Sequence, residues 1–366
     1  MPKYLLAAGG TGGHIFPAIA VAKEILRQQP DSTVEFVGAE GGMETRLVQA
    51  ADFALHTLWI SGLYRQFTFN NLKRNSLLPF KLLYSHIQAK KLLKSYKPDW
   101  VIGFGGYASF AVVRAAIGKQ NIRTAIMEQN AWPGLANRRL APKVNKVFVG
   151  YDAAGKFLNS KETVVTGNPV RPEIGQISKE DARRTLGFST EKPLLFVTGG
   201  SLGARTLNQA LQHNLQLLSE NGIQVLWQCG KYYIEDLKSL AEGNSYLQIV
   251  DFIPRMDCAY AAADLAICRA GALTLAELET ARLPAILVPS PNVAGDHQTA
   301  NAKHHCQDSS GVLITEAEVA KNLISKAVHL LQNKVDLYSM QLALQRRPVH
   351  NAARLLVNHL IHSADG

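Results

Sequence analysis

Two glycine-rich turns, about half a chain apart, constrain this chain more than any other feature. Each lies between an apolar run and a helix start: LLAAGGTGGH at residues 5–14 and LLFVTGGSLGA at residues 194–204. A glycine-rich turn that joins a strand to a helix is typical of the first βα turn of a nucleotide-binding parallel sheet. The near-repeat therefore predicts two Rossmann-like α/β domains.

Apolar runs alternate with helical patterns along the rest of the chain. Strand-like runs lie at residues 3–8, 33–38, 99–106, 123–129 and 146–150, and again at 193–200, 223–230, 247–252, 264–271 and 284–289. Residues 17–29 have apolar side chains at helical spacing. Strands that alternate with helices favour parallel sheets covered on both faces.

The domain join is predicted near residues 164–174, VVTGNPVRPEI, where two prolines and a glycine interrupt the pattern. We expect an N-terminal domain at 1–167 and a C-terminal domain at 168–345. A chain of 366 residues is long enough for two cores. The last helix, about 346–362, carries one apolar stripe, with which it could pack back across the domains. The stripe consists of Val349, Ala352, Ala353, Leu356, Val357 and Leu360.

The net charge of +10 is concentrated in one segment, because residues 65–97 hold eight Lys or Arg and no Asp or Glu. No nucleic-acid motif accompanies this charge, so a nucleic-acid partner is not expected. The four cysteines have no C-x-x-C spacing and no D-x-D occurs, so neither a metal nor another cofactor is expected. The first glycines come within nine residues of the start, which leaves no room for a signal peptide and indicates a cytosolic protein.

The first glycine turn can hold a phosphate on its backbone N–H groups, or it can be only a tight turn beside a packed helix. It fails the dinucleotide fingerprint, since Ile15 stands where G-x-G-x-x-G needs its last glycine. It also fails the Walker A pattern, where His14 and Ile15 replace the Gly-Lys pair. An NAD enzyme and a P-loop NTPase are therefore disfavoured. Further glycine turns at 103–109 and 268–278 predict one domain for a nucleotide diphosphate and the other for a second phosphorylated substrate.

Seven motifs, in order along the chain, resemble the MurG family of peptidoglycan N-acetylglucosaminyltransferases. They are GGTGGHIFPA (9–18), GFGGYAS (103–109), EQNAWPGLANR (128–138), TGNPVR (166–171), TGGSLGAR (198–205), RAGALTLAEL (269–278) and DHQTANA (296–302). The resemblance implies the GT-B fold, with two Rossmann-like domains facing across a cleft. It also implies inverting transfer of N-acetylglucosamine from UDP-N-acetylglucosamine (UDP-GlcNAc) to the 4-hydroxyl of N-acetylmuramic acid in lipid I, forming lipid II.

The resemblance also implies which residues bind the donor. Backbone N–H groups and hydroxyls at Ser201 and at Ala272–Thr274 would offset the charge that grows on departing UDP. Glu277, three residues after Thr274 on the same helix face, would accept hydrogen bonds from the ribose or else be a solvated helix carboxylate. Asp296 and His297 could instead cap a loop, and Asn301 would lie near the donor sugar. The donor set is Thr11, Gly12, Gly13, Asn130, Arg171, Ser201, Phe252, Ile253, Ala272, Leu273, Thr274, Glu277 and Gln298.

On the acceptor side, the matching positions are Thr11, His14, Gly105, Gly106, Tyr107, Glu128, Gln129 and Asn130. The attacking hydroxyl must lose its proton, and a histidine titrates in a suitable range. His14 is the hypothesised base. Its rivals are that His14 orients the acceptor while Glu128 or a water takes the proton, and that His14 only caps the helix. Two stretches depart from the usual motifs, Phe110–Ala111 and Trp132–Pro133, and both fall on the acceptor side.

The basic segment mixes cations with apolar side chains, which suits the anionic surface of a membrane. The alternative is a helix that buries its apolar face in the core. We expect a peripheral protein at the cytoplasmic face of the bacterial inner membrane, where lipid I and other cell-wall synthesis proteins would be its partners. The predicted membrane residues are Leu77, Leu78, Phe80, Lys81, Leu82 and Tyr84.

Two alternative functions remain open. One is another GT-B enzyme, either a glycolipid glycosyltransferase with a different sugar or a UDP-GlcNAc epimerase. The other is a non-catalytic protein that binds a nucleotide sugar. The epimerase is disfavoured because the GGTGGH and EQNA loops provide for a separate acceptor. The non-catalytic protein is disfavoured because His14, Glu277 and both sets of glycine loops are present.

Overall fold

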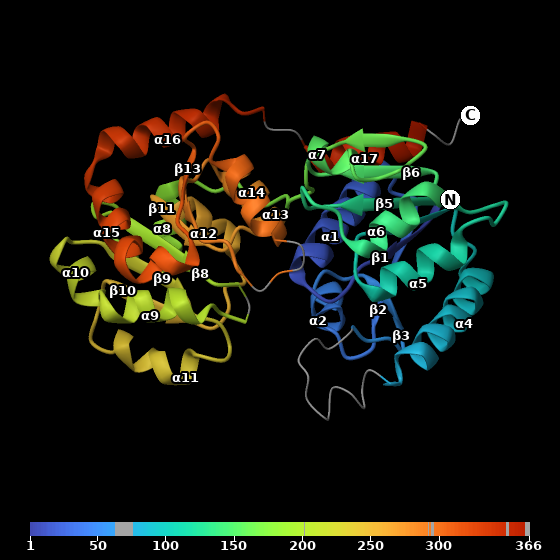
Figure 1. Cartoon of the computed structure of the whole chain (residues 1–366), viewed down its shortest axis with the longest axis horizontal. Coiled ribbons are helices and arrows are strands. Elements are labelled where there is room, and N and C mark those ends of the chain that lie inside the picture. The colour runs from blue at the N-terminus through green and yellow to red at the C-terminus, as the bar shows by residue number, and fades with distance from the viewer. Residues whose placement is uncertain (63–75, 201, 292, 294–295, 349–350, 363–366) are drawn as a thin grey trace. The chain divides into compact units, whose positions relative to one another are not determined.

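The structure is a computed structural model that describes residues 1–62, 76–200, 202–291, 293, 296–348 and 351–362. The chain divides into two compact units. Unit 1 comprises Met1–Arg171 and His350–Gly366, and unit 2 comprises Pro172–Val349 (Figure 1). The division predicted from the sequence lies a few residues earlier at both boundaries.

Unit 1 is built on a parallel sheet, which among the described residues has seven strands in the order β3-β2-β1-β4-β5-β6-β7. Its register places Tyr4 opposite both Val34 and Trp100. The strands are β1 (Lys3–Ala7), β2 (Thr33–Ala39), β3 (Ala54–Leu58), β4 (Trp100–Gly103), β5 (Arg123–Glu128), β6 (Lys146–Val149) and β7 (Thr163–Val165).

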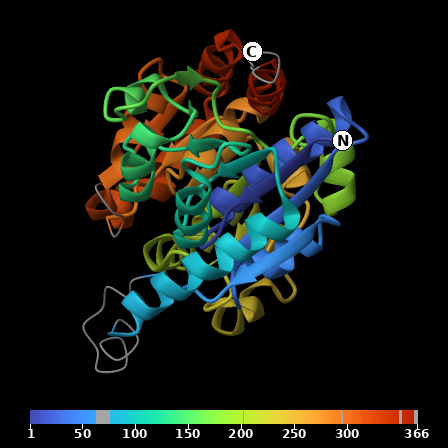
Figure 2. The same cartoon turned by 90° about the vertical axis from the view of Figure 1, so that its right-hand side faces the viewer.

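Helices cover both faces of this sheet. The helices are α1 (Gly12–Gln28), α2 (Met43–Gln49), α4 (Leu78–Tyr96), α5 (Tyr107–Ala116), α6 (Leu135–Leu140), α7 (Asp152–Gly155) and α17 (Ala352–Ile361), with a 3₁₀ turn at Ala141–Lys143. Alternate strand residues point to opposite faces. Tyr4 and Leu6 therefore join the core under α1, α2 and α17, whereas Leu5 and Ala7 join the core under α4, α5 and α6. Figure 2 shows α4 along the outside of this second layer.

Unit 2 repeats the plan with a parallel sheet of six strands, counted over the described residues, in the order β10-β9-β8-β11-β12-β13. The strands are β8 (Leu194–Thr198), β9 (Gln224–Gln228), β10 (Leu247–Val250), β11 (Leu265–Cys268), β12 (Ala285–Leu287) and β13 (Gly311–Leu313). The helices are α8 (Lys179–Leu186), α9 (Arg205–His213), α10 (Leu215–Glu220), α11 (Ile234–Leu237), α12 (Met256–Ala262), α13 (Ala272–Ala281), α14 (His297–His305), α15 (Val319–Gln332) and α16 (Lys334–Arg346), with 3₁₀ turns at Lys238–Ala241 and Glu316–Glu318.

The cores of unit 2 lie on the two faces of its sheet. One core packs under α9, α10, α15 and α16, and the other packs under α8, α12, α13 and α14. The predicted pair of parallel α/β domains is therefore confirmed. The helix predicted at 17–29 begins earlier, at Gly12, so that the end of the first glycine loop is already helical.

Within the part of the chain that the structure describes, none of the helices has the length and apolar character needed to cross a membrane.

The last helix, α17, packs on α1 within unit 1. Leu356 is fully buried, whereas its neighbour Leu355 is 37% exposed. We expect Leu356→Ala to lower the free energy of unfolding by about 2–5 kcal/mol, because it leaves a cavity under α17. Leu355→Ala is the matched control and should cost much less. Urea unfolding measures both, and equal losses would contradict the packing of α17 in the core of unit 1.

Candidate functional site

The candidate site of unit 1 lies where three neighbouring strands end. β4 lies beside both β1 and β5 in the sheet, and all three run parallel. Their carboxyl ends therefore meet at one edge, where open α/β sheets bind ligands. The loops that follow them carry most of the acceptor residues predicted from the sequence.

His14 lies in the first turn of α1, and the loop backbone fixes its ring. Its Nδ1 lies 2.9 Å from the carbonyl oxygen of Gly9 and 3.5 Å from Oγ1 of Thr11, which precedes the helix. A carbonyl oxygen can only accept a hydrogen bond, so Nδ1 carries the proton of the neutral ring. Nε2 then presents a lone pair, which is the state that a general base requires.

Two glycines after β4 pack against this arrangement. A Cβ at Gly105 would lie 2.7 Å from His14 Nε2, and a Cβ at Gly106 would lie 2.5 Å from the carbonyl oxygen of Gly9. Both glycines have positive φ, 110° and 89°, where an L side chain is strained. The loops after β1 and β4 therefore touch at positions where a side chain would not fit.

Glu128 ends β5 and is 2% exposed. Its Oε1 accepts hydrogen bonds from the backbone N–H and the side-chain amide of Asn130, at 3.0 and 3.1 Å. Its Oε2 accepts from the backbone N–H of Gly134 and from Nδ2 of Asn137, both at 2.9 Å. Three donors from the loop after β5 and one from α6 thus surround the carboxylate. This arrangement favours a positioning role for Glu128 over proton transfer.

Three further residues link this loop to its neighbours. The buried Gln129 donates from Nε2 to the carbonyl of Phe104, at 2.8 Å. Asn168 donates from Nδ2 to the carbonyl of Gln129, at 3.0 Å, while its buried Oδ1 has no hydrogen-bond partner among the described residues. Sequence reasoning quoted the TGNPVR motif but did not single out Asn168. Tyr107 begins α5 and is 45% exposed, with its ring against Gly62.

The remaining predicted residues of unit 1 lie around the start of α1. Thr11 is the N-terminal flanking residue of the helix, and Gly12 and Gly13 form its first two positions. A Cβ at Gly12 would meet the ring of Phe16 at 3.1 Å. The guanidinium of Arg171 lies 4.6 Å from the centre of the same ring. Arg171 is thus held at α1 by a cation–π contact.

The two departures from the usual motifs have different surroundings. Phe110 packs against the core under α5, next to the buried Ala111. Trp132 is 37% exposed, and its ring lies 4.4 Å from that of Phe157. Arg138 lies 5.7 Å from the Trp132 ring. The bulky residue at 132 is therefore stacked on its neighbours at the surface.

In unit 2, the start of α13 is the candidate anion site. The helix begins at Ala272 after Gly271, and no side chain among the described residues caps it. The first N–H groups of a helix have no intrahelical acceptor and attract anions. The predicted ALT residues, Ala272, Leu273 and Thr274, form this first turn.

Glu277 lies one turn further along α13 and is 2% exposed. Its Oε2 accepts a hydrogen bond from the hydroxyl of Tyr260, at 3.0 Å. The alternative of a solvated carboxylate is therefore wrong, because the side chain is buried and held.

Helix α14 and the loop that joins it to β12 carry the next group of predicted residues. Gln298 accepts a hydrogen bond on Oε1 from the backbone N–H of Ser290, at 2.9 Å. Asn301 is fully buried and donates from Nδ2 to the carbonyl of Ala270, at 3.3 Å. Asp296 flanks the start of α14, and its carboxylate accepts from the Thr299 hydroxyl, at 2.6 Å. Asn301 thus supports the turn that leads into α13.

Sequence reasoning missed Arg269, which follows β11 and binds two other segments at this edge of unit 2. Its guanidinium donates to the carbonyls of Val288 and Pro289, at 3.2 and 3.3 Å, and forms an ion pair with Glu316. Burial raises the pKa of Glu316, but the hydrogen bonds from Arg269 and Thr206 outweigh it, so the pKa lies below its ordinary value. The RAG letters gave no signal of these long-range partners.

Three predicted donor residues remain, Phe252, Ile253 and Ser201. Ile253 is buried in the core under α12, next to the partly exposed Phe252. Ser201 lies outside the described residues.

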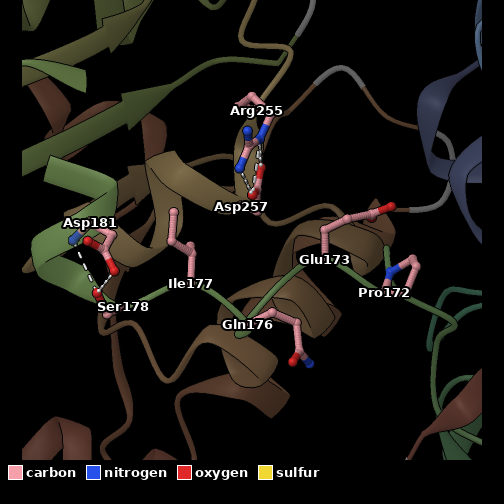
Figure 3. Close-up of a pocket in the computed structure, with 8 residues that line it drawn as sticks. All are labelled: Pro172, Glu173, Gln176, Ile177, Ser178, Asp181, Arg255 and Asp257. Atoms are coloured by element: carbon pink, nitrogen blue, oxygen red, sulfur yellow. Dashed lines mark hydrogen bonds and ion pairs between the residues drawn. The ribbon is translucent and has the colours of Figure 1, made fainter. Parts of the chain in front are cut away.

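A surface hollow of about 590 Å³ lies in unit 2 (Figure 3). It is lined by Pro172, Glu173, Gln176, Ile177, Ser178, Asp181, Arg255 and Asp257. Two pairs of its polar residues, Arg255 with Asp257 and Ser178 with Asp181, are hydrogen-bonded to each other. Arg255 donates two hydrogen bonds to Asp257, at 2.9 and 2.7 Å, which hold the pKa of that carboxyl below its ordinary value. Ser178 caps α8 by accepting from the backbone N–H of Asp181. None of the residues predicted from the sequence lines this hollow.

Comparison with known proteins gives consistent matches. The glycosyltransferase family 28 N-terminal domain matches residues 4–149, and the C-terminal domain of that family matches residues 194–356. The UDP-N-acetylglucosamine--N-acetylmuramyl-(pentapeptide) pyrophosphoryl-undecaprenol N-acetylglucosamine transferase of Cytophaga hutchinsonii is 43% identical over 334 residues, which cover 91% of this chain and 89% of that protein.

Solved structures match over nearly the whole length. The crystal structure of Acinetobacter baumannii MurG aligns with a TM-score of 0.74 and 31% identity, covering 99% of this chain and 100% of that one. The UDP-GlcNAc 2-epimerase of Neisseria meningitidis aligns with a TM-score of 0.65 and 14% identity, covering 98% of this chain and 100% of that one. The second likeness shows the fold alone.

The contact between Gly105 and His14 can be tested directly. We expect Gly105→Ala to displace the imidazole and to lower the free energy of unfolding by about 1–3 kcal/mol more than the control does. The control is Gly118→Ala, which has a similarly positive φ of 78° but no atom within 4 Å of the added Cβ. Urea unfolding and the ring resonances of His14 are the measurements. Identical behaviour of the two variants would contradict the contact.

Proposed function

Because the chain belongs to glycosyltransferase family 28, and within it to the UDP-N-acetylglucosamine--N-acetylmuramyl-(pentapeptide) pyrophosphoryl-undecaprenol N-acetylglucosamine transferases, we propose that His14 is its general base. The enzyme has the GT-B fold and transfers N-acetylglucosamine from UDP-GlcNAc to the lipid-linked muramyl pentapeptide in peptidoglycan synthesis. We propose in addition the proton transfer, the residues that bind donor and acceptor, and the surface that docks the enzyme on the membrane.

The observation that carries the proposal is the hydrogen bond between His14 Nδ1 and the Gly9 carbonyl, at 2.9 Å. It fixes the tautomer in which Nε2 can accept a proton. The ring is also fixed in space, because Gly105 packs against its Nε2 edge. A base that is already oriented avoids the cost of ordering during the reaction.

The reaction we propose is a single displacement. The 4-hydroxyl oxygen of N-acetylmuramic acid attacks the anomeric carbon of N-acetylglucosamine while the bond from that carbon to the UDP oxygen breaks. The hydroxyl proton passes to His14 Nε2, and the bonding electron pair leaves with UDP. Attack opposite to the leaving group inverts the anomeric centre, which yields the β-1,4 linkage.

The donor end of the proposal rests on α13. The N–H groups of Ala272, Leu273 and Thr274 at its start would receive the charge that develops on UDP. Glu277 would accept hydrogen bonds from the ribose, and its burial and its hydrogen bond from Tyr260, which hold the carboxylate in place, support this role. Arg171, Ser201, Phe252, Ile253 and Gln298 complete the proposed donor set, with Thr11, Gly12, Gly13 and Asn130 from unit 1.

The acceptor end uses the loops of unit 1. The backbone of Gly105 and Gly106 and the exposed Tyr107 would contact the muramyl diphosphate. Gln129 and Asn130 belong to the loop that Glu128 holds together through four hydrogen bonds. The rival proton acceptors are Glu128 and a water molecule. The saturated carboxylate of Glu128 makes it the weaker candidate.

We also propose that α4 docks the enzyme on the anionic cytoplasmic face of the bacterial inner membrane, where lipid I and other cell-wall synthesis proteins would be found. The side of α4 that faces the sheet buries Ser85, Ala89 and Leu93. The opposite side exposes large apolar residues at helical spacing: Phe80 (67%), Leu83 (63%), Tyr84 (50%) and Ile87 (54%). This distribution opposes the alternative of an apolar face buried in the core.

Cations border the apolar face of α4. Lys81 donates to the hydroxyl of Ser61, at 3.0 Å, and lies 5.4 Å from the centre of the Trp59 ring. Lys90, Lys91 and Lys94 are exposed further along the helix. Leu77 is 44% exposed, Leu82 is 38% exposed and Leu78 is half-buried at the start of the helix. An apolar face bordered by lysines fits an anionic lipid surface.

The base assignment predicts that His14→Ala lowers kcat by about 10²- to 10⁴-fold. The kcat/KM profile should also lose its acidic limb, because that limb reports protonation of the free base. Transfer of labelled N-acetylglucosamine to a lipid I analogue, followed across pH, measures both effects.

His56→Ala is the matched control, since His56 is also a histidine of unit 1 but pairs with Glu35 on β2. It should leave the pH profile unchanged. A His14→Ala enzyme with near-normal turnover and an unaltered profile would contradict the base role. UDP release from UDP-GlcNAc that ignores the lipid I analogue would contradict the transferase and favour a protein that only handles the nucleotide sugar.

The docking surface predicts that Leu83→Ser or Ile87→Ser weakens binding to vesicles containing anionic lipid by about tenfold or more. Transfer to a water-soluble acceptor should persist, because the change lies outside the proposed site. Vesicle sedimentation at low and high salt is the measurement. Val335→Ser is the matched control, since Val335 is 74% exposed in unit 2. Binding that ignores anionic lipid and salt, or that survives both changes in α4, would contradict the docking proposal.

A further inference from the structure

Glu44, at the start of α2, is a fully buried carboxylate beneath the first glycine loop. Its Oε1 accepts a hydrogen bond from the backbone N–H of Ala39, at 2.6 Å, at the end of β2. Its Oε2 accepts from the backbone N–H of Gly10, at 3.4 Å. Both hydrogen bonds to this side chain, among the described residues, come from backbone amides. One carboxylate thereby joins the end of β2 to the loop that precedes His14.

Three glycines provide the space that this carboxylate occupies. A Cβ at Gly9 would lie 2.6 Å from Oε1, and a Cβ at Gly42 would lie 2.5 Å from Cδ. A Cβ at Gly38 would overlap Cγ. None of the three has positive φ, so backbone conformation does not account for glycine there. The Glu44 side chain does.

We propose that Glu44 is a positioning residue of the transferase, which holds Gly9 and Gly10 so that the Gly9 carbonyl keeps the His14 ring in its basic tautomer. The inference rests on the proposed role of His14 as base. The connection is short. Glu44 binds the N–H of Gly10, the carbonyl of the preceding residue binds His14 Nδ1 at 2.9 Å, and the lone pair lies on Nε2.

Glu44→Gln is the sharpest variant, because it keeps the shape of the side chain. An amide has one acceptor oxygen and one donor NH₂ group. If the oxygen stays on Ala39, the NH₂ faces the N–H of Gly10, and two donors then oppose each other. The loop must shift, and the Gly9 carbonyl shifts with it. A displacement of about 1 Å in a catalytic group can cost about 10²-fold in rate.

The expected results are a kcat lowered by about 10- to 100-fold and a changed ring state of His14. In the wild-type enzyme, ¹⁵N NMR of the His14 ring should show a protonated Nδ1 and an unprotonated Nε2. In Glu44→Gln it should show a mixture of the two tautomers. A role in stability alone would not move these resonances in a variant that remains folded.

Glu24→Gln is the matched control. It removes the charge of another buried carboxylate in unit 1, which lies near the far end of α1 and pairs with Arg27. It should lower stability while leaving kcat and the His14 resonances unchanged. Gly42→Ala is the second variant in case Glu44→Gln does not fold. Its Cβ displaces the carboxylate but keeps the charge, so it should change the His14 resonances in the same direction.

A double-mutant cycle separates this inference from the base proposal. If Glu44 acts through His14, adding Glu44→Gln to His14→Ala should cause almost no further loss of rate. Multiplying losses would overturn the inference, and so would wild-type kcat and unchanged resonances in a folded Glu44→Gln or Gly42→Ala enzyme. Full activity of His14→Ala alone would instead overturn the base proposal.

Discussion

The candidate acceptor site depends on one close approach, that of the loops after β1 and β4. A Cβ at Gly106 would lie 2.5 Å from the carbonyl oxygen of Gly9, so only glycine allows the two backbones to meet at this distance. That carbonyl also accepts the hydrogen bond of His14. The carbonyl oxygen of Gly9 thus takes part both in the packing of the two loops and in the orientation of the His14 ring.

Unit 2 uses the same device with a different neighbour. There the loop after β8 approaches the loop after β9, since a Cβ at Gly203 would overlap the carbonyl of Cys229 and a Cβ at Gly230 would overlap the backbone of Gly203. The two glycine turns look alike in sequence, yet they contact different neighbours. The turn after β1 contacts the loop after β4, which is the next strand on one side of the sheet, whereas the turn after β8 contacts the loop after β9, which corresponds to the strand on the other side. The helices that follow also differ, because α1 places a histidine in its first turn and α9 places Arg205 and Thr206 there. Two stretches that nearly repeat each other in sequence therefore form loops with different neighbours and different first helical residues.

The sequence predicted what depends on local patterns, and it missed what depends on contacts between distant segments. Long apolar runs and glycine turns were enough for both parallel sheets and for the loops at their carboxyl ends. The edge strands β3, β7 and β13 were not predicted, and their residues are mostly exposed or only partly buried. Glu44 reads as an ordinary acidic residue in the first turn of a helix. Its partners at Gly9, Gly10 and Ala39 become visible only once the sheet is formed. Arg269 and Asn168 were not predicted for the same reason, because their partners lie far away in the sequence.

Helix α4 exposes its largest apolar side chains and buries mostly smaller ones, which is the reverse of a helix that faces only water. Toward the sheet it buries a serine, an alanine and a leucine, while phenylalanine, leucine, tyrosine and isoleucine face outward. Exposing a large apolar side chain forgoes about 1.5–3 kcal/mol relative to burying it, and contiguous exposed apolar patches mark surfaces that meet another apolar phase. In the docking proposal the larger side chains of α4 meet a second surface, and the lysines beside them favour one of negative charge.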